Sequence, residues 1–497
     1  MGFITCCNLY GQADTVFCYT YGGIQNDVCN QIKSTDDGGY IMIGTSNSFG
    51  CGNTDFYAVK IDSLGRHEWS KSYGGIENEE GFSVTQTFDK GYAFLGFTDS
   101  YGAGGYDVYL VKTDSMGNFQ WQRTYGGSDW DFGYSIQQLS DSGFIMCGLT
   151  YSYGSGNGNV YVIRTDKIGN ALWTTAVVDT NYYEYYSVGN SICVEKDFLY
   201  AIVGNFSPKE GDTNAYVVLI NNKGIVKKTT TYGIKNNHYG NSINKTLDNG
   251  FIIFGATDSA ELGKPDEMLL KLDSVGQMQW MQVYTSAGYS IGHDAMQSPD
   301  GSYVAISTSN AYGIGGFAMR VWHIDATGTP LCAPSHGGKG AQQGNSLTIA
   351  GNGNVAFAGA SNSPGFTEGL YDIMLVQWKS DSLINTYPFT IKNFYDTCFC
   401  TLGVESQDII HPEVRIFPNP VSSSATLLVQ GDMGEDYFFN LYNEQGECIL
   451  YRTPLQSTNR GQSIAHIERS NLPPGIYICE ILNGTGTKVA SGKIIMQ

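Results

Sequence analysis

Residues 133–175 read GYSIQQLSDSGFIMCGLTYSYGSGNGNVYVIRTDKIGNALWTT and decide the fold. Four short segments in this stretch have strand character, at 133–139, 144–150, 160–165 and 171–175. Turn residues separate them, because Ser140-Asp-Ser-Gly143 and Asp166-Lys-Ile-Gly169 are typical of tight turns with glycine at a positive φ. No helical period occurs. The stretch therefore predicts four antiparallel strands joined by short connections.

This unit is repeated along the chain. The tripeptide Tyr-Gly-Gly begins at Tyr21, Tyr73 and Tyr125, so both intervals are 52 residues, and weaker copies follow as far as about 387. A repeat of this length, made of four strands, is typical of a β-propeller. The distance from 21 to 387 holds about seven such units. We predict an all-β chain with a seven-bladed β-propeller over residues 14–388.

Two further landmarks recur in the units. An Asp-x-x-Gly turn comes before the fourth segment, and a tryptophan follows four residues after its glycine, at Trp69, Trp121, Trp173 and Trp280. A large aromatic side chain at a fixed position predicts packing between neighbouring blades. Residues 15–20 precede the first Tyr-Gly-Gly and occupy the slot of a fourth strand. We expect this segment to complete the last blade and close the ring.

The strand and Asp-x-x-Gly stretch at 109–121 also resembles the repeat of quinoprotein-like propellers. The resemblance covers about a dozen residues per unit. Those enzymes usually have eight blades, whereas we count seven, so we predict no cofactor.

The repeat ends before residues 389–412, which we interpret as a linker. Residues 413–497 alternate in a way that predicts a small antiparallel β-sandwich. They are similar to the type A C-terminal sorting domain of type IX secretion. The matching elements are a Phe-Pro-Asn-Pro opening, a Tyr-Asn-Glu-Gln-Gly turn, a Leu-Pro-Pro-Gly-Ile-Tyr strand entry and a basic last strand. The residues that carry this signal are Pro418, Asn419, Pro420, Gly446, Gly475, Tyr477 and Lys493.

The resemblance implies export by a cleaved signal peptide and then passage through the outer membrane by the type IX machinery. Release, or attachment to the cell surface, would follow. Residues 1–13 contain a short apolar run before Ala13 and are interpreted as the remnant of a signal peptide or as a disordered N-terminus.

Composition and motifs argue against several classes of function. The formal net charge is −19, which disfavours nucleic acid because such binding needs a basic surface. No segment is long and apolar enough to cross a bilayer, and the cysteines lack zinc-site spacing.

Gly288-Tyr-Ser-Ile-Gly292 spells a nucleophile elbow, but it lies where a first strand begins and not at a strand-to-helix turn. We predict no catalytic residue and no metal.

One set of residues suggests a binding site. The position six residues after each Tyr-Gly-Gly tyrosine would enter the innermost strand at one mouth of the channel. Carboxylates beside aromatic faces suit a sugar or a cation, although each acid could instead cap its own turn. The candidates are Asp27, Glu79, Asp131, Glu184 and His238, with the aromatic residues Trp130, Tyr182 and Tyr183; Ser290 and Gln342 occupy the same position in later units.

The leading hypothesis is a secreted or cell-surface protein that binds a glycan or protein ligand without catalysis, for example in adhesion. A polysaccharide-active hydrolase or lyase that uses the channel-mouth carboxylates is the main alternative. A quinoprotein-like oxidoreductase is the third.

Overall fold

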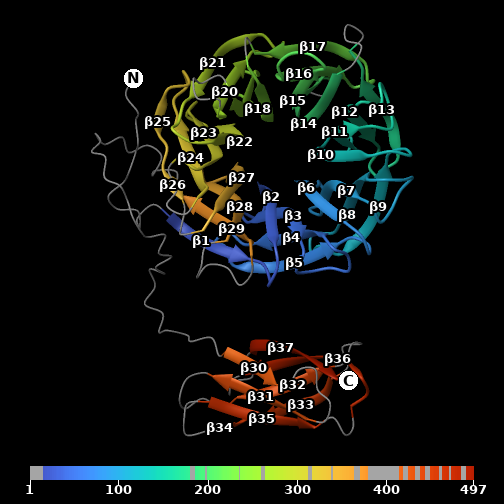
Figure 1. The fold of residues 1–497 in the computed structure, drawn as a ribbon, viewed down its shortest axis with the longest axis vertical. Helices are drawn as coiled ribbons and strands as arrows, with labels where there is room; N and C mark the ends of the chain where they lie inside the picture. Colours follow the sequence, from blue (N-terminus) through green and yellow to red (C-terminus); the bar gives the residue numbers. More distant parts are fainter. Residues whose placement is uncertain are drawn as a thin grey trace. The chain divides into compact units, whose positions relative to one another are not determined.

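The computed structural model divides the chain into two compact units, residues 1–401 and 402–497 (Figure 1). In the first unit it describes residues 15–179, 185–195, 199–233, 236–258, 264–311, 316–336, 340–362 and 370–378. In the second it describes residues 413–417, 424–430, 437–442, 448–457, 462–468, 472–482 and 488–496. These ranges contain strands and no helix, which confirms the all-β prediction, and none of their elements is a helix that could cross a bilayer.

The described part of residues 15–378 forms seven antiparallel sheets. The first sheet consists of β2 (Asp27–Ser34), β3 (Tyr40–Ser46), β4 (Asp55–Ile61) and β5 (His67–Tyr73). The second consists of β6 (Glu79–Gln86), β7 (Tyr92–Thr98), β8 (Asp107–Thr113) and β9 (Phe119–Tyr125). The third consists of β10 (Asp131–Gln138), β11 (Phe144–Thr150), β12 (Asn159–Thr165) and β13 (Ala171–Val177).

The next three sheets are β14 (Tyr185–Glu195), β15 (Leu199–Pro208), β16 (Asn214–Asn221) and β17 (Val226–Tyr232); β18 (His238–Lys245), β19 (Phe251–Thr257), β20 (Asp266–Leu272) and β21 (Met278–Tyr284); and β22 (Ser290–Gln297), β23 (Tyr303–Ser309) and β24 (Ala318–Ile324) with β25 (Pro330–Cys332) and β26 (Ser335–His336). The seventh contains β27 (Gln342–Ile349), β28 (Val355–Ser361), β29 (Asp372–Trp378) and β1 (Thr15–Tyr21).

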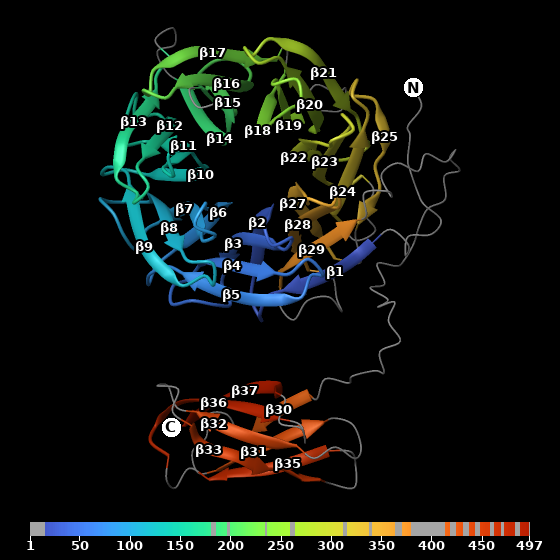
Figure 2. The same ribbon diagram turned by 180° about the vertical axis from the view of Figure 1, so that it is seen from behind.

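The sheets stand around a central axis, as Figures 1 and 2 show from opposite sides. The innermost strands β2, β6, β10, β14, β18, β22 and β27 contact one another in that order, and β27 contacts β2. This radial arrangement is that of a β-propeller. The predicted closure is confirmed, because β1 pairs with β29 in antiparallel register, from Thr15 opposite Trp378 to Tyr21 opposite Ile373.

A tyrosine hydroxyl joins each of several sheets to the next one. The side chain of Tyr73 in β5 donates to the carbonyl of Gly117, 44 residues later, at 2.7 Å. The acceptor glycine ends the Asp-x-x-Gly turn of the following sheet. The same bond occurs from Tyr21 to Gly65, Tyr125 to Gly169, Tyr232 to Gly276 and Tyr284 to Gly328.

Where the tyrosine is absent, other groups supply the bond. Val177 occupies the tyrosine position in β13. There Thr175 donates its hydroxyl to the carbonyl of Gly224 at 2.9 Å, and the Trp173 indole donates to Asn222 O, also at 2.9 Å. The junction between sheets is therefore retained although the repeat sequence has changed.

The repeated tryptophans pack against the same turns, as predicted. Gly117 has φ +73°, and a Cβ at this position would lie 2.8 Å from the Trp69 ring. Trp69 also contacts Tyr92 of the next sheet, with 5.7 Å between the ring centroids. Glycine is needed here both for the positive φ and for the close approach of the indole.

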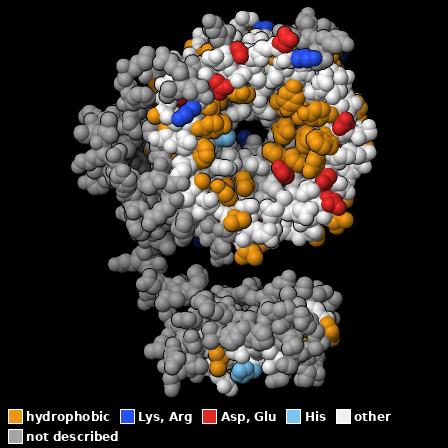
Figure 3. Space-filling view, in the orientation of Figure 1, with side chains coloured by type: hydrophobic (Ala, Val, Ile, Leu, Met, Phe, Trp, Pro, Cys, Tyr) orange, Lys and Arg blue, Asp and Glu red, His pale blue; other side chains and the backbone are white. Residues whose placement is uncertain are grey.

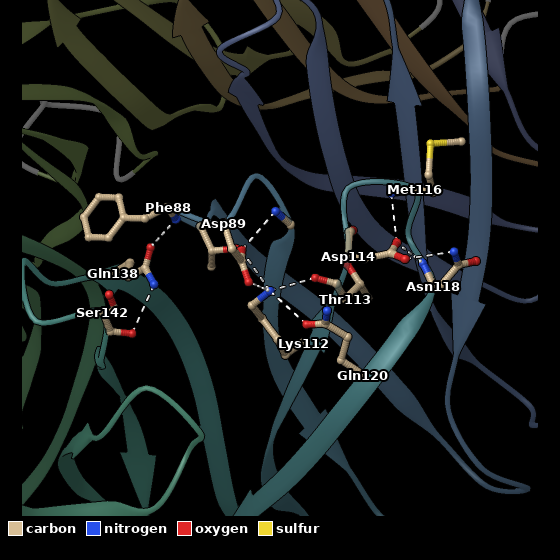
Figure 4. A network of polar contacts seen from close by, with 12 residues as sticks. Phe88, Asp89, Lys112, Thr113, Asp114, Met116, Asn118, Gln120, Gln138 and Ser142 are labelled. Atoms are coloured by element: carbon tan, nitrogen blue, oxygen red, sulfur yellow. Dashed lines mark hydrogen bonds and ion pairs between the residues drawn. The ribbon is translucent and has the colours of Figure 1, made fainter.

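A buried cation joins the strands at the same end of several sheets, beside the Asp-x-x-Gly turn. In the sheet β6–β9, Lys112 Nζ contacts both carboxylate oxygens of Asp89 and donates to Thr113 O and Gln120 Oε1 (Figure 4). The ammonium group therefore joins the turn between the first two strands to the third and fourth strands. We call this arrangement the lysine clasp. It recurs with Lys60 and Asp37, Arg164 and Asp141, and Lys271 and Asp248.

The second unit contains two four-stranded antiparallel sheets that share one core, as in a β-sandwich. One sheet consists of β30 (Glu413–Phe417), β31 (Ser424–Gln430), β35 (Gln462–Glu468) and β34 (Gln456–Ser457); the other consists of β33 (Cys448–Pro454), β32 (Phe438–Tyr442), β36 (Gly475–Leu482) and β37 (Lys488–Met496). Leu427 of the first sheet and Phe439 and Ile481 of the second are fully buried in the shared core.

The junction between sheets predicts a steric effect. Replacing Gly117 with alanine should destabilise the fold by about 1–3 kcal/mol more than Gly156→Ala, because the new methyl group would overlap the Trp69 ring. Gly156 is a matched control, since its φ of +79° is similar and nothing lies within 4 Å of a Cβ built there. Chemical denaturation measures both free energies of unfolding. Equal losses for the two variants would contradict the packing argument.

The lysine clasp predicts a pH effect on stability. Although burial raises the pKa of Asp248, hydrogen bonds from Lys271, Thr246 and Gly250 outweigh it and lower that pKa to about 2. A lowered pKa in the folded state stabilises the fold above pH ~4, and this contribution is lost as the pH falls toward 2. Asp248→Asn should therefore be less stable at pH 7, by about 1 kcal/mol because the carboxylate is half-exposed.

Denaturation midpoints of the wild type and Asp248→Asn at pH 7, 4 and 2 measure this effect. The two proteins should converge at pH 2, and a difference that does not depend on pH would contradict the assignment.

Candidate binding site at the mouth of the channel

The innermost strands line a central channel with a volume of about 700 Å³. Each of these strands has a β-bulge, as where the register shifts between Gly81 and Ser83 of β6. A bulge leaves one residue outside the ladder and turns its side chain to a new direction. In the seven sheets these residues are Asn30, Phe82, Tyr134, Asn190, Asn241, His293 and Asn345, and all of them line the channel.

The asparagines at the bulges connect neighbouring innermost strands. The side-chain amide of Asn30 donates to Gly81 O at 2.8 Å, and that of Asn345 donates to Cys29 O at 2.8 Å across the closure of the ring. Asn190 and Asn241 make the same bond to the following sheet. The channel wall is therefore polar where asparagine occupies the bulge and aromatic at Phe82 and Tyr134.

The predicted acids lie at the start of the innermost strands, but they are buried. Asp27, Glu79 and Asp131 are each 0% exposed. Asp131 Oδ2 accepts from Gly127 N at 2.8 Å and from Ser152 Oγ at 2.6 Å. Asp27 and Glu79 accept from the backbone four residues earlier in the same way, at 2.7 Å. These bonds are those of the turn-capping alternative.

A second carboxylate accompanies each of these acids. Asp55 begins β4, and a Cβ built on Gly74 would lie 2.2 Å from Asp55 Oδ1 and 2.3 Å from Glu79 Oε2. The first glycine of each Tyr-Gly-Gly thus separates two carboxylates, and it must lack a side chain. Burial raises the pKa of Asp55, and the neighbouring Glu79 adds to this effect. Asp107 and Asp131 form an equivalent pair around Gly126.

The remaining residues at this position are also internal. His238 is 3% exposed, and its Nδ1 lies 3.0 Å from Asn236 O. Ser290 begins β22 as expected for a first strand, and it is hydrogen-bonded to Ser309 and Ser286. Gln342 is 1% exposed. Glu184, Tyr182 and Tyr183 lie outside the described residues.

Trp130 is accessible and belongs to an aromatic cluster that the sequence did not reveal. Its indole is 52% exposed and lies 6.1 Å from Tyr106 and 6.5 Å from Phe132, measured between ring centroids. Phe97 lies under these rings, 4.9 Å from Phe132. We call this set the aromatic cluster; its members are Phe82, Phe97, Tyr106, Trp130, Phe132, Tyr134 and Tyr151.

The cluster joins the sheets β6–β9 and β10–β13 and reaches the channel wall at Phe82 and Tyr134. Figure 3 shows a broad hydrophobic patch beside the channel opening, with acidic side chains at its border. The sequence analysis named Trp130 among the candidates, and the only signal for the other members was the 52-residue interval between Phe82 and Tyr134. Aromatic rings of this kind can stack on a sugar or enclose a cation.

The sorting-signal residues are described in part. Gly475 begins β36, and Tyr477 is buried and donates its hydroxyl to Pro473 O at 2.9 Å. Lys493 lies in β37 opposite Ile478. Pro418, Asn419, Pro420 and Gly446 lie outside the described residues.

Comparison with solved structures finds other proteins at low identity. A puromycin hydrolase is 12% identical with a TM-score of 0.47 over 85% of this chain, which spans only 62% of the hydrolase. An ulvan lyase, a polysaccharide lyase, is 9% identical with a TM-score of 0.47 over 74% of this chain and 100% of its own. The β-propeller domain of the Trilobed protease from Pyrococcus furiosus is 9% identical with a TM-score of 0.40, over 73% and 94%.

At these identities and TM-scores the likeness says nothing about the activity of this chain, so the names hydrolase and lyase apply to those proteins alone. No curated protein matches the chain. Residues 415–497 match the family described as the secretion system C-terminal sorting domain. The C-terminal unit is therefore a sorting domain of type IX secretion, and it belongs to a β-propeller repeat protein that is secreted or attached to the outer-membrane surface.

Proposed function

We propose that this secreted propeller binds an extracellular ligand, a glycan or a protein, without catalysis, for example in adhesion. The observation that carries the proposal is the aromatic cluster, in which Trp130 is half-exposed and Phe82 and Tyr134 line the channel. An indole in water has a free-energy cost that a stacked ligand would remove. The buried part of the cluster, including Phe97 at 8% exposure, would hold the exposed rings in place.

The proposal includes the architecture that the ligand would meet. We take the seven sheets to be the complete set of blades, since the innermost strands contact one another in a closed cycle. Residues 14–388 would form this ring, residues 389–412 a linker and residues 413–497 the sorting domain. The type IX machinery would recognise the last of these, and release or surface attachment would follow export.

The geometry gives less support to a polysaccharide hydrolase or lyase that uses the channel-mouth carboxylates. Asp27, Glu79 and Asp131 accept hydrogen bonds from their own turns and have no exposed surface. A general acid or nucleophile needs to reach the glycosidic bond. Binding by the aromatic cluster, in contrast, does not need these acids to be exposed.

The proposal predicts that binding depends on Trp130. A glycan array and a screen of extracellular proteins with the full chain should yield a ligand whose affinity falls about tenfold or more in Trp130→Ala, because one stacking face is lost. Trp69→Phe is a suitable control, since Trp69 packs between sheets and is 8% exposed. Binding that is unchanged in Trp130→Ala would refute the proposed site.

The buried acids should matter for stability and not for binding. Asp131→Ala removes the acceptor of the Gly127 amide and the Ser152 hydroxyl, so the free energy of unfolding should fall by about 1–3 kcal/mol. The affinity of the folded variant for the same ligand should stay within about twofold of the wild type. A loss of affinity with unchanged stability would favour the carboxylate-based alternative.

A further inference from the structure

One carboxylate beside the aromatic cluster is not explained by the repeat. Glu80 lies on β6 next to the capping residue Glu79, where the other innermost strands carry mostly apolar residues. The equivalent position relative to the bulge is occupied by Val28, Phe132, Val188, Tyr239, Ile291 and Gln343. Packing and turn geometry therefore do not require an acid at this position.

Glu80 lies among aromatic rings. It is directly opposite Phe97 in the β6–β7 ladder, so the two side chains share one face of the sheet. Phe97 in turn contacts Tyr106 at 5.0 Å and Phe132 at 4.9 Å. The charge of Glu80 contributes, after burial and other neighbours, to the raised pKa values of both Tyr106 and Tyr134. By geometry, Glu80 shares one face of the sheet with the ring that contacts Tyr106 and Phe132.

The carboxylate is half-buried, and within the described part of the chain it has neither a hydrogen bond nor an ion pair. The acids of the repeat differ in this respect, since Asp131 accepts two hydrogen bonds. Burial raises the pKa of Glu80 above its ordinary value. A partly desolvated carboxylate has an electrostatic cost that a bound cation would offset.

We propose that Glu80 and the aromatic cluster form a binding site for an ammonium group. The carboxylate would supply the opposite charge, and the faces of Tyr106, Trp130 and Phe132 would supply cation–π attraction. This inference rests on the proposed function and names the chemistry of its ligand: a protonated amine, carried by an amino sugar or by a lysine side chain.

The experiment uses the full chain and two pairs of probes. A glucosamine hexamer is compared with the N-acetylglucosamine hexamer, and a tetralysine peptide with its acetylated form. In each pair, acetylation removes the positive charges of the amines and leaves the rest of the probe unchanged. Titrations at about 0.15 M salt screen the general attraction of cations to a chain with a net charge of −19.

The variants are Glu80→Gln, which keeps the shape of the side chain, Trp130→Ala, and the control Glu210→Gln, which neutralises an exposed carboxylate in the loop after β15. The wild type should bind at least one charged probe about tenfold or more tighter than its neutral partner. Glu80→Gln should abolish that preference, whereas Glu210→Gln should keep it. The probe pair that shows the preference identifies the source of the amine.

Two results would overturn the inference. If neutral probes or other ligands bind in a Trp130-dependent manner and Glu80→Gln has no effect, the ammonium site is wrong and the proposed binding function stands. If no ligand of either kind binds to the folded wild type, both proposals fall. Thermal melting of Glu80→Gln establishes that the variant is folded.

Discussion

The contact between one sheet's fourth strand and the next sheet's turn is the constraint on which the ring depends. Sheets arranged radially share no continuous ladder, so side-chain contacts add to single backbone bonds such as that from Glu79 N to Thr54 O. Tyr73 does this with a hydroxyl donated to Gly117 O, and Trp69 packs over the same glycine. The turn can receive both groups only because glycine adopts a positive φ without a side chain. Each junction contributes only a few contacts, and closure of the ring makes the stability of every junction depend on its neighbours.

The capping acids follow from the same geometry. At the start of each innermost strand the chain turns sharply from the fourth strand of one sheet to the first strand of the next, and backbone N–H groups at this turn face the interior. Asp27, Glu79 and Asp131 accept these groups. A second acid, such as Asp107, caps the loop that lies beside the same turn. Where both acids are present, the cost is a pair of neighbouring buried carboxylates, and burial together with the neighbouring Asp131 raises the pKa of Asp107.

The period of the sequence was enough to predict the strands, the closure by residues 15–20 and the packing of the tryptophans, because these depend on residues that recur. It was not enough to separate a carboxylate that faces the channel from one that faces its own turn. The direction of the carboxylate depends on how the end of the strand is rotated, and this rotation does not change the interval between repeats in the sequence. Trp130 was named as a candidate from the sequence, but the rest of the aromatic cluster was missed for a related reason. Phe97, Tyr106 and Trp130 occupy different positions within the repeat. Phe97 and Tyr106 meet within one sheet, and contact with the next sheet adds Trp130.

The two kinds of residue differ in how evenly they are spread around the ring. Interactions that stabilise the sheets tend to recur, and they can change in concert. In the sheet that contains β28 and β29, Gln377 stands at the lysine position and Asn352 at that of the turn aspartate. A ligand, in contrast, contacts one sector of the ring, so selection for binding acts on single positions. Glu80 has this character, since it is charged where its equivalents are mostly apolar and no partner in the repeat compensates for it. In a molecule made of near-copies, a departure from the repeat that lacks a compensating change is therefore a better indicator of a binding residue than a recurring charge.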